Sequence, residues 1–510
     1  MDAEQAYDAV PYTSKPFAES HPDRLYVVGR LLGLQPPPVE TARVLELGCA
    51  SGGNLLPIAV RLPQTTCVGV DISGVQIREG QDLVRAVGAT NCTLIHADLT
   101  MLEDLGEFDY IIAHGLWSWV PELVQDAVLK RIQSALSPQG LAYISYNTYP
   151  GWFRRGMVRE MCRWHVRDLA DDSERVSQAR TLVAFMLSAL EDDPSNHAGA
   201  IRHEAKLLQQ TDTTYMTHGL LADINTPAWY HEMAARVRAH ALQIIGDADL
   251  SVMLHNDLSP TAQQALSEVN PGSDRYEQLA DLLENRTFRR SVLAHAGAHP
   301  QRPAHWQAVT ELHASTLARE VPGDVPTFAL FTGGHFSVRH PLIAGAMRHL
   351  ATVRPRSVPF NELLTFARSA PGAQASPDDP LFLAQSLLTM MTKRAVTLVP
   401  RDLGIATPAS DRPVACPLVR ERARRGLAVP SLRHVNFVLR SMDQHLVQLL
   451  DGTADTTVLL QRLERLRSEG VLRVEGPTGT LSDPVIFRAA CRQGLPDWLD
   501  GIAKAGFLTG

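Results

Sequence analysis

Residues 44–54 read VLELGCASGGN, and this stretch decides the fold of the chain. Its first four residues form a short apolar run, which is typical of a buried parallel strand. The run ends in a turn that contains three glycines, and residues 55–60 then have the apolar content of a helix. A glycine turn between a strand and a helix brings backbone N–H groups close to a ligand, at a helix end that favours negative charge. The stretch therefore predicts a ligand site.

The pattern differs from that of a dinucleotide site, which needs G-x-G-x-x-G and a pyrophosphate at the helix end. Here Gly48 is followed by Gly52 and Gly53, and Ala50 stands at the position of the middle glycine. Glu46 would repel a pyrophosphate. A ligand with an ammonium and a carboxylate fits better, because the turn N–H groups can bind the carboxylate and Glu46 can bind the ammonium. S-adenosylmethionine has such an end.

Two more acids follow predicted strands. The run TCVGVD ends in Asp71, which is placed to accept hydrogen bonds from both ribose hydroxyls, and the run TLIHAD ends in Asp98, which could accept from the adenine amino group. Ile72 and Leu99 follow these acids and could hold the purine between them. Strand-end acids can also simply cap helices. Three strands that each end in a suitable acid favour the S-adenosylmethionine site.

These residues resemble motif I and the next two motifs of the class I S-adenosylmethionine-dependent methyltransferases. Residues 12–22, YTSKPFAESHP, and residues 146–152, YNTYPGW, are similar to the bacterial methyltransferases that carry a methyltransferase regulatory domain. That group includes the rickettsial protein-lysine methyltransferases that modify an outer-membrane surface protein, and it shares the alanine at position 50. The expected cofactor-binding residues are Glu46, Gly48, Cys49, Ala50, Gly52, Asn54, Asp71, Ile72, Asp98, Leu99 and His114.

The fold class follows from the alternation of strands and helices. Strands are predicted at 43–47, 66–70, 92–96, 108–113 and 141–146, with helices that begin near 54, 74 and 121. This order predicts an α/β, doubly wound, Rossmann-like sheet with its ligand outside the carboxyl ends of the strands.

The loops after the fourth and fifth strands are expected to meet at the cofactor site. An amine acceptor must lose its proton before methylation, and a desolvated aromatic pocket lowers the pKa of an ammonium. Trp117 and Tyr149 are candidates for such a pocket, together with Trp119 and Tyr146, although aromatic residues could also simply wall the cofactor site. We expect Tyr149 to orient the acceptor or to take its proton.

Three further groups are expected near the methyl acceptor. Asn147 offers a carbonyl acceptor for an amine N–H, and the backbone carbonyl of His114 could hold the methionine ammonium. In the resembling family the N-terminal segment packs near the active site, so Tyr12, Phe17 and His21 could cover the acceptor.

Composition narrows the function classes. The chain has 510 residues, of which 45% are hydrophobic and 20% are charged, as in a soluble protein of several domains. The net charge of −7 argues against nucleic-acid binding. The six cysteines lack metal-ligand spacing, so no metal is expected and a reducing compartment is indicated. There is no signal-peptide pattern and no apolar stretch of ~18 residues, which favours a cytoplasmic location without membrane insertion.

Four regions are predicted: an N-terminal lid at 1–40, the methyltransferase domain at 41–172, a helical regulatory domain at 173–322, and a winged-helix-like interaction region at 323–510. Because every cofactor motif lies before residue 150, the last region is expected to serve substrate recognition or dimerisation rather than cofactor binding. The lack of a basic cluster there disfavours DNA binding.

The sequence thus predicts an S-adenosylmethionine-dependent methyltransferase with protein lysine as the expected acceptor class. A small-molecule methyltransferase of a biosynthetic pathway would use the same core. A non-catalytic regulator that senses S-adenosylmethionine is the alternative from another functional class.

Overall fold

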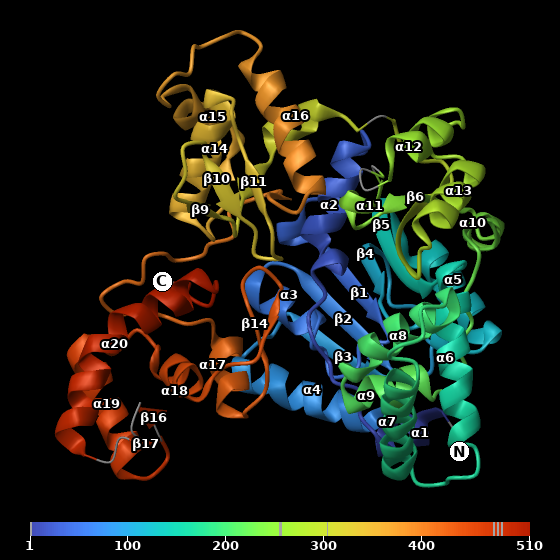
Figure 1. Ribbon diagram of the computed structural model, residues 1–510, viewed down its shortest axis with the longest axis horizontal. Coiled ribbons are helices and arrows are strands. Elements are labelled where there is room, and N and C mark those ends of the chain that lie inside the picture. Colours follow the sequence, from blue (N-terminus) through green and yellow to red (C-terminus); the bar gives the residue numbers. More distant parts are fainter. Residues whose placement is uncertain are drawn as a thin grey trace.

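The computed structural model describes residues 3–253, 255, 258–302, 304–472, 475–476, 479–480 and 483–509. A central sheet lies in the middle of the molecule (Figure 1). Its first five strands are β1 (Arg43–Leu47), β2 (Thr66–Asp71), β3 (Cys92–His96), β4 (Phe108–Ala113) and β5 (Leu136–Asn147). These strands are mutually parallel, which confirms the doubly wound fold. The strand order is β3-β2-β1-β4-β5-β7-β6, so the order reverses between β1 and β4, where such sheets bind ligands.

Two strands from the region predicted to be helical complete this sheet. They are β6 (Leu242–Asp247) and β7 (Phe288–His295), and β7 runs antiparallel to both β5 and β6. The edge of β5 is thereby paired along Ala142 to Asn147. The sheet therefore crosses the boundary predicted at residue 172, because β6 and β7 both lie beyond this residue.

Alternate residues of β1 belong to the cores on the two faces of the sheet. Val44 belongs to the core that contains residues of α2 (Pro22–Leu31), α3 (Leu55–Arg61) and α4 (Gly74–Val87). Leu45 and Leu47 belong to the core that contains residues of α5 (Glu122–Ala135) and α10 (Tyr230–Ala239). Burial of β1 between two helical layers holds the glycine turn that follows it in place.

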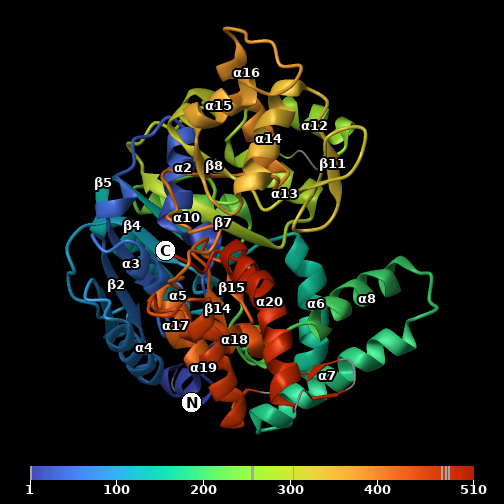
Figure 2. The ribbon, with the colours of Figure 1, turned by 90° about the vertical axis from the view of Figure 1, so that its left-hand side faces the viewer.

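A helical excursion with its own core follows the fifth strand. It consists of α6 (Gly151–His165), α7 (Asp172–Ala189) and α8 (Asn196–Gln209), and α7 and α8 project away from the sheet (Figure 2). A short helix α9 (Thr213–Tyr215) and a π-helical turn η4 (Met216–Leu220) then return the chain to the sheet edge. The helices that flank β6 and β7 are α11 (Leu250–Met253), α12 (Pro260–Ser267) and α13 (Asp274–Glu284).

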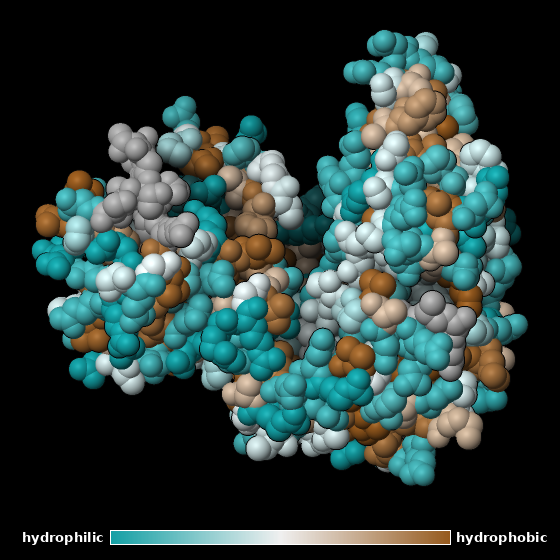
Figure 3. Space-filling view, turned by 90° about the horizontal axis from the view of Figure 1, so that it is seen from below, coloured by the Kyte–Doolittle hydropathy of each residue, from teal (hydrophilic) through white to brown (hydrophobic). Residues whose placement is uncertain are grey.

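The final third forms two units. The first contains β8 (His313–Ser315), β9 (Arg319–Val321), β10 (Thr327–Ala329), β11 (His335–Ser337), α14 (Pro341–Val353), β12 (Val358–Pro359), α15 (Phe360–Arg368), α16 (Asp379–Thr392) and β13 (Thr397–Val399). The second contains α17 (Pro417–Arg424), β14 (Val429–Pro430), β15 (Asn436–Phe437), α18 (Ser441–Leu449), α19 (Thr456–Ser468), β16 (Glu475–Gly476), β17 (Gly479–Thr480) and α20 (Pro484–Lys504). The surface is hollowed between this second unit and the rest of the chain (Figure 3).

The remaining elements are short and mostly N-terminal: α1 (Ala3–Ala9), η1 (Ala18–Ser20), η2 (Val39–Thr41), η3 (Trp117–Trp119) and η5 (Trp306–Glu311). Within the described ranges, none of the helices has the length and apolarity needed to span a bilayer.

A buried ion-pair network fastens β7 to α13. The guanidinium of Arg289 is 1% exposed and donates to both oxygens of Asp281 at 2.8 Å and to Glu277 at 3.1 and 3.2 Å. We predict that Arg289→Ala lowers the free energy of unfolding by about 3–5 kcal/mol, because it removes an arginine from two buried carboxylates, of which Asp281 keeps Arg286 at 3.0 Å. Thermal unfolding followed by circular dichroism measures the loss.

The matched control is Arg238→Ala, which removes an ion pair between α10 and Asp274 of the same helix α13, with N···O distances of 2.6 and 3.0 Å. Arg238 is about half exposed, so its loss should cost less than about 1 kcal/mol. Equal losses in the two variants would show that the buried network does not hold the end of the sheet.

Candidate active site

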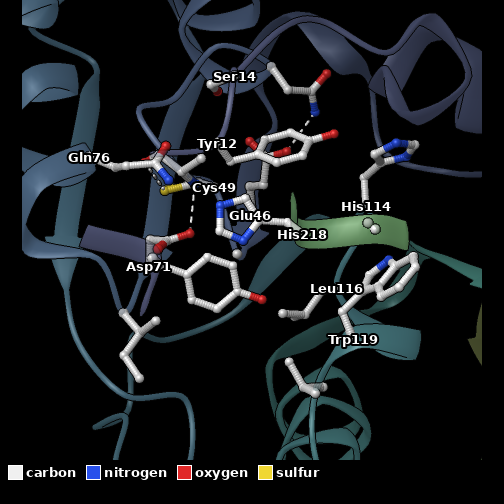
Figure 4. Close-up of a pocket in the computed structure, with 18 of the residues that line it drawn as sticks. Tyr12, Ser14, Glu46, Cys49, Asp71, Gln76, His114, Leu116, Trp119 and His218 are labelled. Carbon is white, nitrogen blue, oxygen red and sulfur yellow. Dashed lines mark hydrogen bonds between the residues drawn. The ribbon is translucent and has the colours of Figure 1, made fainter. Parts of the chain in front are cut away.

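A cavity of about 520 Å³ lies at the carboxyl ends of β1, β2 and β4. Most of the residues that were predicted to bind the cofactor line it: Glu46, Gly48, Cys49, Ala50, Asn54, Asp71, Ile72, Asp98, Leu99 and His114. Figure 4 shows Glu46 and Asp71 on its wall, with His218 between them and Tyr12 above. Gly52 is the predicted cofactor residue that does not line the cavity. It has a φ of +73° and packs against Leu94 beneath the turn.

The turn after β1 is held by hydrogen bonds within the protein. Its left-handed positions include Gly48 at φ +76° and Ala50 at φ +51°. The N–H groups of Gly48 and Cys49 donate to Val70 O at 2.8 and 3.1 Å, and Ala50 N–H donates to Asp71 Oδ2 at 2.7 Å. These N–H groups therefore fix the turn to β2 and are not free to bind a carboxylate, contrary to the expectation from the glycine pattern.

Glu46 is a buried acidic residue in the cavity wall. Its side chain is 3% exposed, and Oε1 accepts a hydrogen bond from Asn54 Nδ2 at 2.7 Å. Oε2 is buried and has no hydrogen-bond partner within the part of the chain that the structure describes. The pKa of Glu46 is raised from 4.5 to about 8: burial is the largest cause, the Asn54 hydrogen bond lowers the pKa in part, and the nearby Asp71 raises it. A buried carboxylate oxygen without a partner fits a cationic ligand group.

Asp71 is fixed by two backbone groups. Its Oδ2 accepts from Ala50 N–H at 2.7 Å and its Oδ1 accepts from Ser73 N–H at 2.9 Å. Burial raises the pKa of Asp71, and the backbone hydrogen bonds lower it. Each carboxylate oxygen has a further lone pair, so the side chain can accept from a diol. Asp98 is exposed at the rim, where its Oδ1 accepts from the backbone and hydroxyl of Thr100, both at 2.8 Å.

His114 and Asn147 line the cavity from β4 and β5. Burial lowers the pKa of His114 to about 3, and its Nδ1 lies 2.9 Å from the hydroxyl of Tyr143. The ring of Phe17 stacks on His114 with centroids 3.6 Å apart. Asn147 Nδ2 donates to Asn225 Oδ1 at 2.8 Å, so a residue beyond β5 orients this amide.

The structure gives Tyr149 and Trp117 no place in the cavity lining. Tyr149 follows the end of β5, and its ring stacks on Phe153 at 4.4 Å and tilts against Trp229 at 5.3 Å. Trp117 is 2% exposed in the core next to α5. His21 is also buried away from the cavity, where its Nδ1 accepts from Asp23 N–H and caps α2.

The N-terminal segment covers the cavity, as its resemblance implied. Tyr12 and Phe17 both line the cavity, and Tyr12 is 36% exposed at its edge. Burial and, to a smaller extent, the nearby Asp212 together raise the pKa of Tyr12 to about 12. Ser14 Oγ accepts from Gly53 N–H at 2.7 Å, which fastens the segment to the glycine turn.

The cavity lining also contains residues that sequence reasoning did not assign to the site, among them Tyr7, Lys15, Tyr215 and His218. Tyr7 lies on α1 and stacks against His218 with centroids 5.2 Å apart. Tyr215 and His218 come from α9 and the π-helical turn, so the helical region also reaches the cavity. Lys15 stands within the quoted N-terminal motif, and its cationic side chain was the one available signal. The described residues contain no group of three side chains placed to hold a metal ion.

Comparisons with known proteins identify the class. A methyltransferase domain model matches residues 44–140, a predicted methyltransferase regulatory domain matches 212–295, and a "PKMT, C-terminal winged helix domain" matches 411–507. PKMT2 from Rickettsia typhi, also solved in complex with AdoHcy, has the same fold: the TM-score is 0.89 at 24% identity, over 98% of this chain and 100% of that chain. The protein is thus an S-adenosylmethionine-dependent methyltransferase with a winged-helix region.

Sequence relatives define the family. The uncharacterized protein RP789 of Rickettsia prowazekii is 40% identical over 290 residues, which cover 57% of this chain but only about half, 52%, of that protein. RP028 of the same organism is 36% identical over 241 residues, which cover 47% of this chain and 96% of that protein. The chain belongs to this family, the class I methyltransferases with a regulatory domain that are similar to the rickettsial PKMTs.

The contact between the glycine turn and the N-terminal segment can be tested at Gly53. A Cβ at this position would stand 2.4 Å from the carbonyl carbon of Ser14 and 2.6 Å from its oxygen. Because both are backbone atoms, we predict that Gly53→Ala displaces the segment and weakens S-adenosylhomocysteine binding about tenfold. Calorimetry measures the affinity, and chymotrypsin should cleave faster at Tyr12 and Phe17.

Gly156→Ala on α6 is the control, because its Cβ would meet nothing within 4 Å. It should leave both readouts unchanged. An unaltered affinity and cleavage rate in Gly53→Ala would show that the segment does not depend on this contact.

Proposed function

We propose that this cavity binds S-adenosylmethionine and that the protein methylates lysine side chains of a protein substrate. The observation that carries the proposal is that Oε2 of Glu46, which is buried in the same cavity as Asp71, has no hydrogen-bond partner among the described residues. Glu46 would hold the ammonium of the methionine moiety, and Asp71 would hold the ribose hydroxyls. Asp98 would accept from the adenine amino group, with Ile72 and Leu99 on either side of the purine.

Lys15 is the group that fits the methionine carboxylate. Its side chain lines the cavity next to Phe17, whose ring centroid lies 5.8 Å from the Lys15 ammonium. The N–H groups of Gly48, Cys49 and Ala50 are bonded within the protein, so a cation from the lid would take their place. Cofactor binding and lid closure would then depend on each other.

The lining favours an amine over a hydroxyl as the acceptor. Bound S-adenosylmethionine would supply a methyl group on a sulfonium, which a neutral amine accepts in an in-line displacement without a strong base. The pKa of His114 is about 3, so its imidazole binds a proton only weakly at neutral pH. The pKa of Tyr12 is about 12, so its hydroxyl keeps its proton at neutral pH. Both side chains are therefore poor bases. Apolar walls such as Leu116 and Trp119 disfavour an ammonium and so promote its deprotonation.

The edge of the cavity supports a macromolecular acceptor. Pro121 and Ile224 line the cavity and are also exposed, and Leu123 beside them is 72% exposed. Exposed apolar residues next to a pocket fit the chain segments that flank a methylated side chain. The fold shared with PKMT2 over 98% of this chain supports the same acceptor class.

The cofactor assignment can be tested by measuring the protons that Glu46 releases when the ligand binds. At pH 7 its raised pKa leaves the carboxyl largely protonated, and a bound ammonium would lower this pKa. We predict that S-adenosylhomocysteine binding at pH 7 releases protons in the wild type but not in Glu46→Gln, and that the variant binds about ten- to a hundredfold more weakly. Calorimetry in buffers of different ionisation enthalpy measures the release.

The same variant should be more stable. The folded protein keeps the Glu46 proton between pH 4.5 and about 8, whereas the unfolded chain loses it, so wild-type stability falls as pH rises through this window. Glu46→Gln removes the effect and should gain up to about 3 kcal/mol at pH 7. The absence of proton release in the wild type would contradict the cofactor assignment. The absence of a gain in stability in Glu46→Gln would contradict the raised pKa of Glu46.

The acceptor class requires a direct assay. Purified protein is incubated with methyl-labelled S-adenosylmethionine and a lysate of the source organism, which is then divided into macromolecular and small-molecule fractions. We predict label in protein, recovered as methyl-lysine after hydrolysis, and none with Asp71→Ala. Label confined to small molecules would overturn the protein-lysine proposal and support the biosynthetic alternative.

A further inference from the structure

A hairpin of the winged-helix region contacts Asn54, a residue of the cavity wall. Its strands are β14 and β15, and His434 stands in the turn between them at a φ of +59°. The turn is closed by Ser431 N–H, which donates to Val435 O at 2.7 Å. His434 is 5% exposed, and its Nε2 lies 2.7 Å from Asn54 Oδ1, a contact across 380 residues of sequence.

The direction of this hydrogen bond follows from the other partners of Asn54. Phe17 N–H donates to Asn54 Oδ1 at 2.9 Å, which fixes this atom as the carbonyl oxygen. Asn54 Nδ2 then donates to Glu46 Oε1 at 2.7 Å. His434 must therefore carry its proton on Nε2 and donate it to Asn54. The chain of hydrogen bonds runs from His434 through Asn54 to the carboxylate of Glu46.

We propose that His434 is a positioning residue of the cofactor site, which orients Glu46 through Asn54. Asn54 directly precedes α3 but makes no capping bond to that helix. Its side-chain amide is hydrogen-bonded instead to Glu46, Phe17, Ser20 and His434. The winged-helix region thus serves cofactor binding as well as any role in recognition. This inference rests on the proposed cofactor site.

The hairpin is held in place by contacts that do not touch the cavity. Arg61 on α3 donates to Leu432 O and to Leu403 O, the latter at 2.6 Å. Arg433 of the same turn donates to Ser315 Oγ at 2.9 Å and to Thr397 Oγ1 at 3.1 Å. Because these contacts fix the backbone of the docked region, the His434 ring can be changed while the hairpin stays in place.

A pair of amide variants separates positioning from folding. His434→Asn suits the left-handed backbone, since asparagine tolerates positive φ, but its amide is too short to reach Asn54. His434→Gln carries its amide nitrogen as many bonds from Cα as the imidazole Nε2. We expect S-adenosylhomocysteine affinity to fall about three- to tenfold in His434→Asn and to recover in His434→Gln.

The pH dependence of S-adenosylhomocysteine binding tests whether His434 acts through Asn54 and Glu46. The groups around this carboxylate are Asp71 and Asn54, and those around His434 are His21 and Arg61. Since the Asn54 hydrogen bond lowers the pKa of Glu46, a loosened Asn54 should move the pH midpoint of S-adenosylhomocysteine binding upward in His434→Asn alone. A loss of packing without loss of the hydrogen bond would not move this midpoint.

His445→Asn is the control, a matched substitution on α18 of the same region at a residue that does not line the cavity. Unchanged affinity in His434→Asn, failure of His434→Gln to restore it, or an equal loss in His445→Asn would overturn the inference. Failure of the wild type to bind S-adenosylhomocysteine at all would instead overturn the proposed cofactor site.

Discussion

The buried carboxylate of Glu46 is the constraint on which the site depends. An isolated carboxylate in an apolar cavity is costly, and here only one of its two oxygens has a partner in the described chain. The fold bears this cost because β1 is covered on both faces by helical layers. The rigid strand holds the Glu46 carboxyl, which burial keeps largely protonated at pH 7, where a ligand cation would favour its ionised form. Glu46 therefore lowers the stability of the free protein and provides affinity for a cationic ligand group.

Three distant parts of the chain meet at Asn54, the residue that orients this carboxylate. The N-terminal segment contributes Phe17 N–H, the glycine turn contributes Asn54 itself, and the winged-helix region contributes His434. The cavity is also lined by Tyr215 and His218 from the helical region. The four regions predicted from the sequence thus build one site, although each has its own stretch of sequence.

The parts of the site that depend on local sequence could be predicted. Glu46, Asp71 and Asp98 follow or end strands whose apolar runs identify them, and parallel strands bring their carboxyl ends together. Strands β6 and β7 were missed because they lie among helices, and β7 pairs with β5, which is far away along the chain. Tyr149 was misplaced because its position depends on packing against Phe153 and Trp229, which a count from the strand end cannot show.

His434 could not be found from sequence at all, and its case shows why motif position is a poor guide to domain roles. All the cofactor motifs lie before residue 150, which suggested that the last third serves recognition alone. A motif marks residues whose backbone must approach the ligand. A group that orients one of those residues only has to lie within hydrogen-bond distance of it, and any segment that packs nearby can supply such a group. The hairpin of the winged-helix region docks on α3 where Arg61 donates to Leu432 O, and its turn then places a donor 2.7 Å from Asn54.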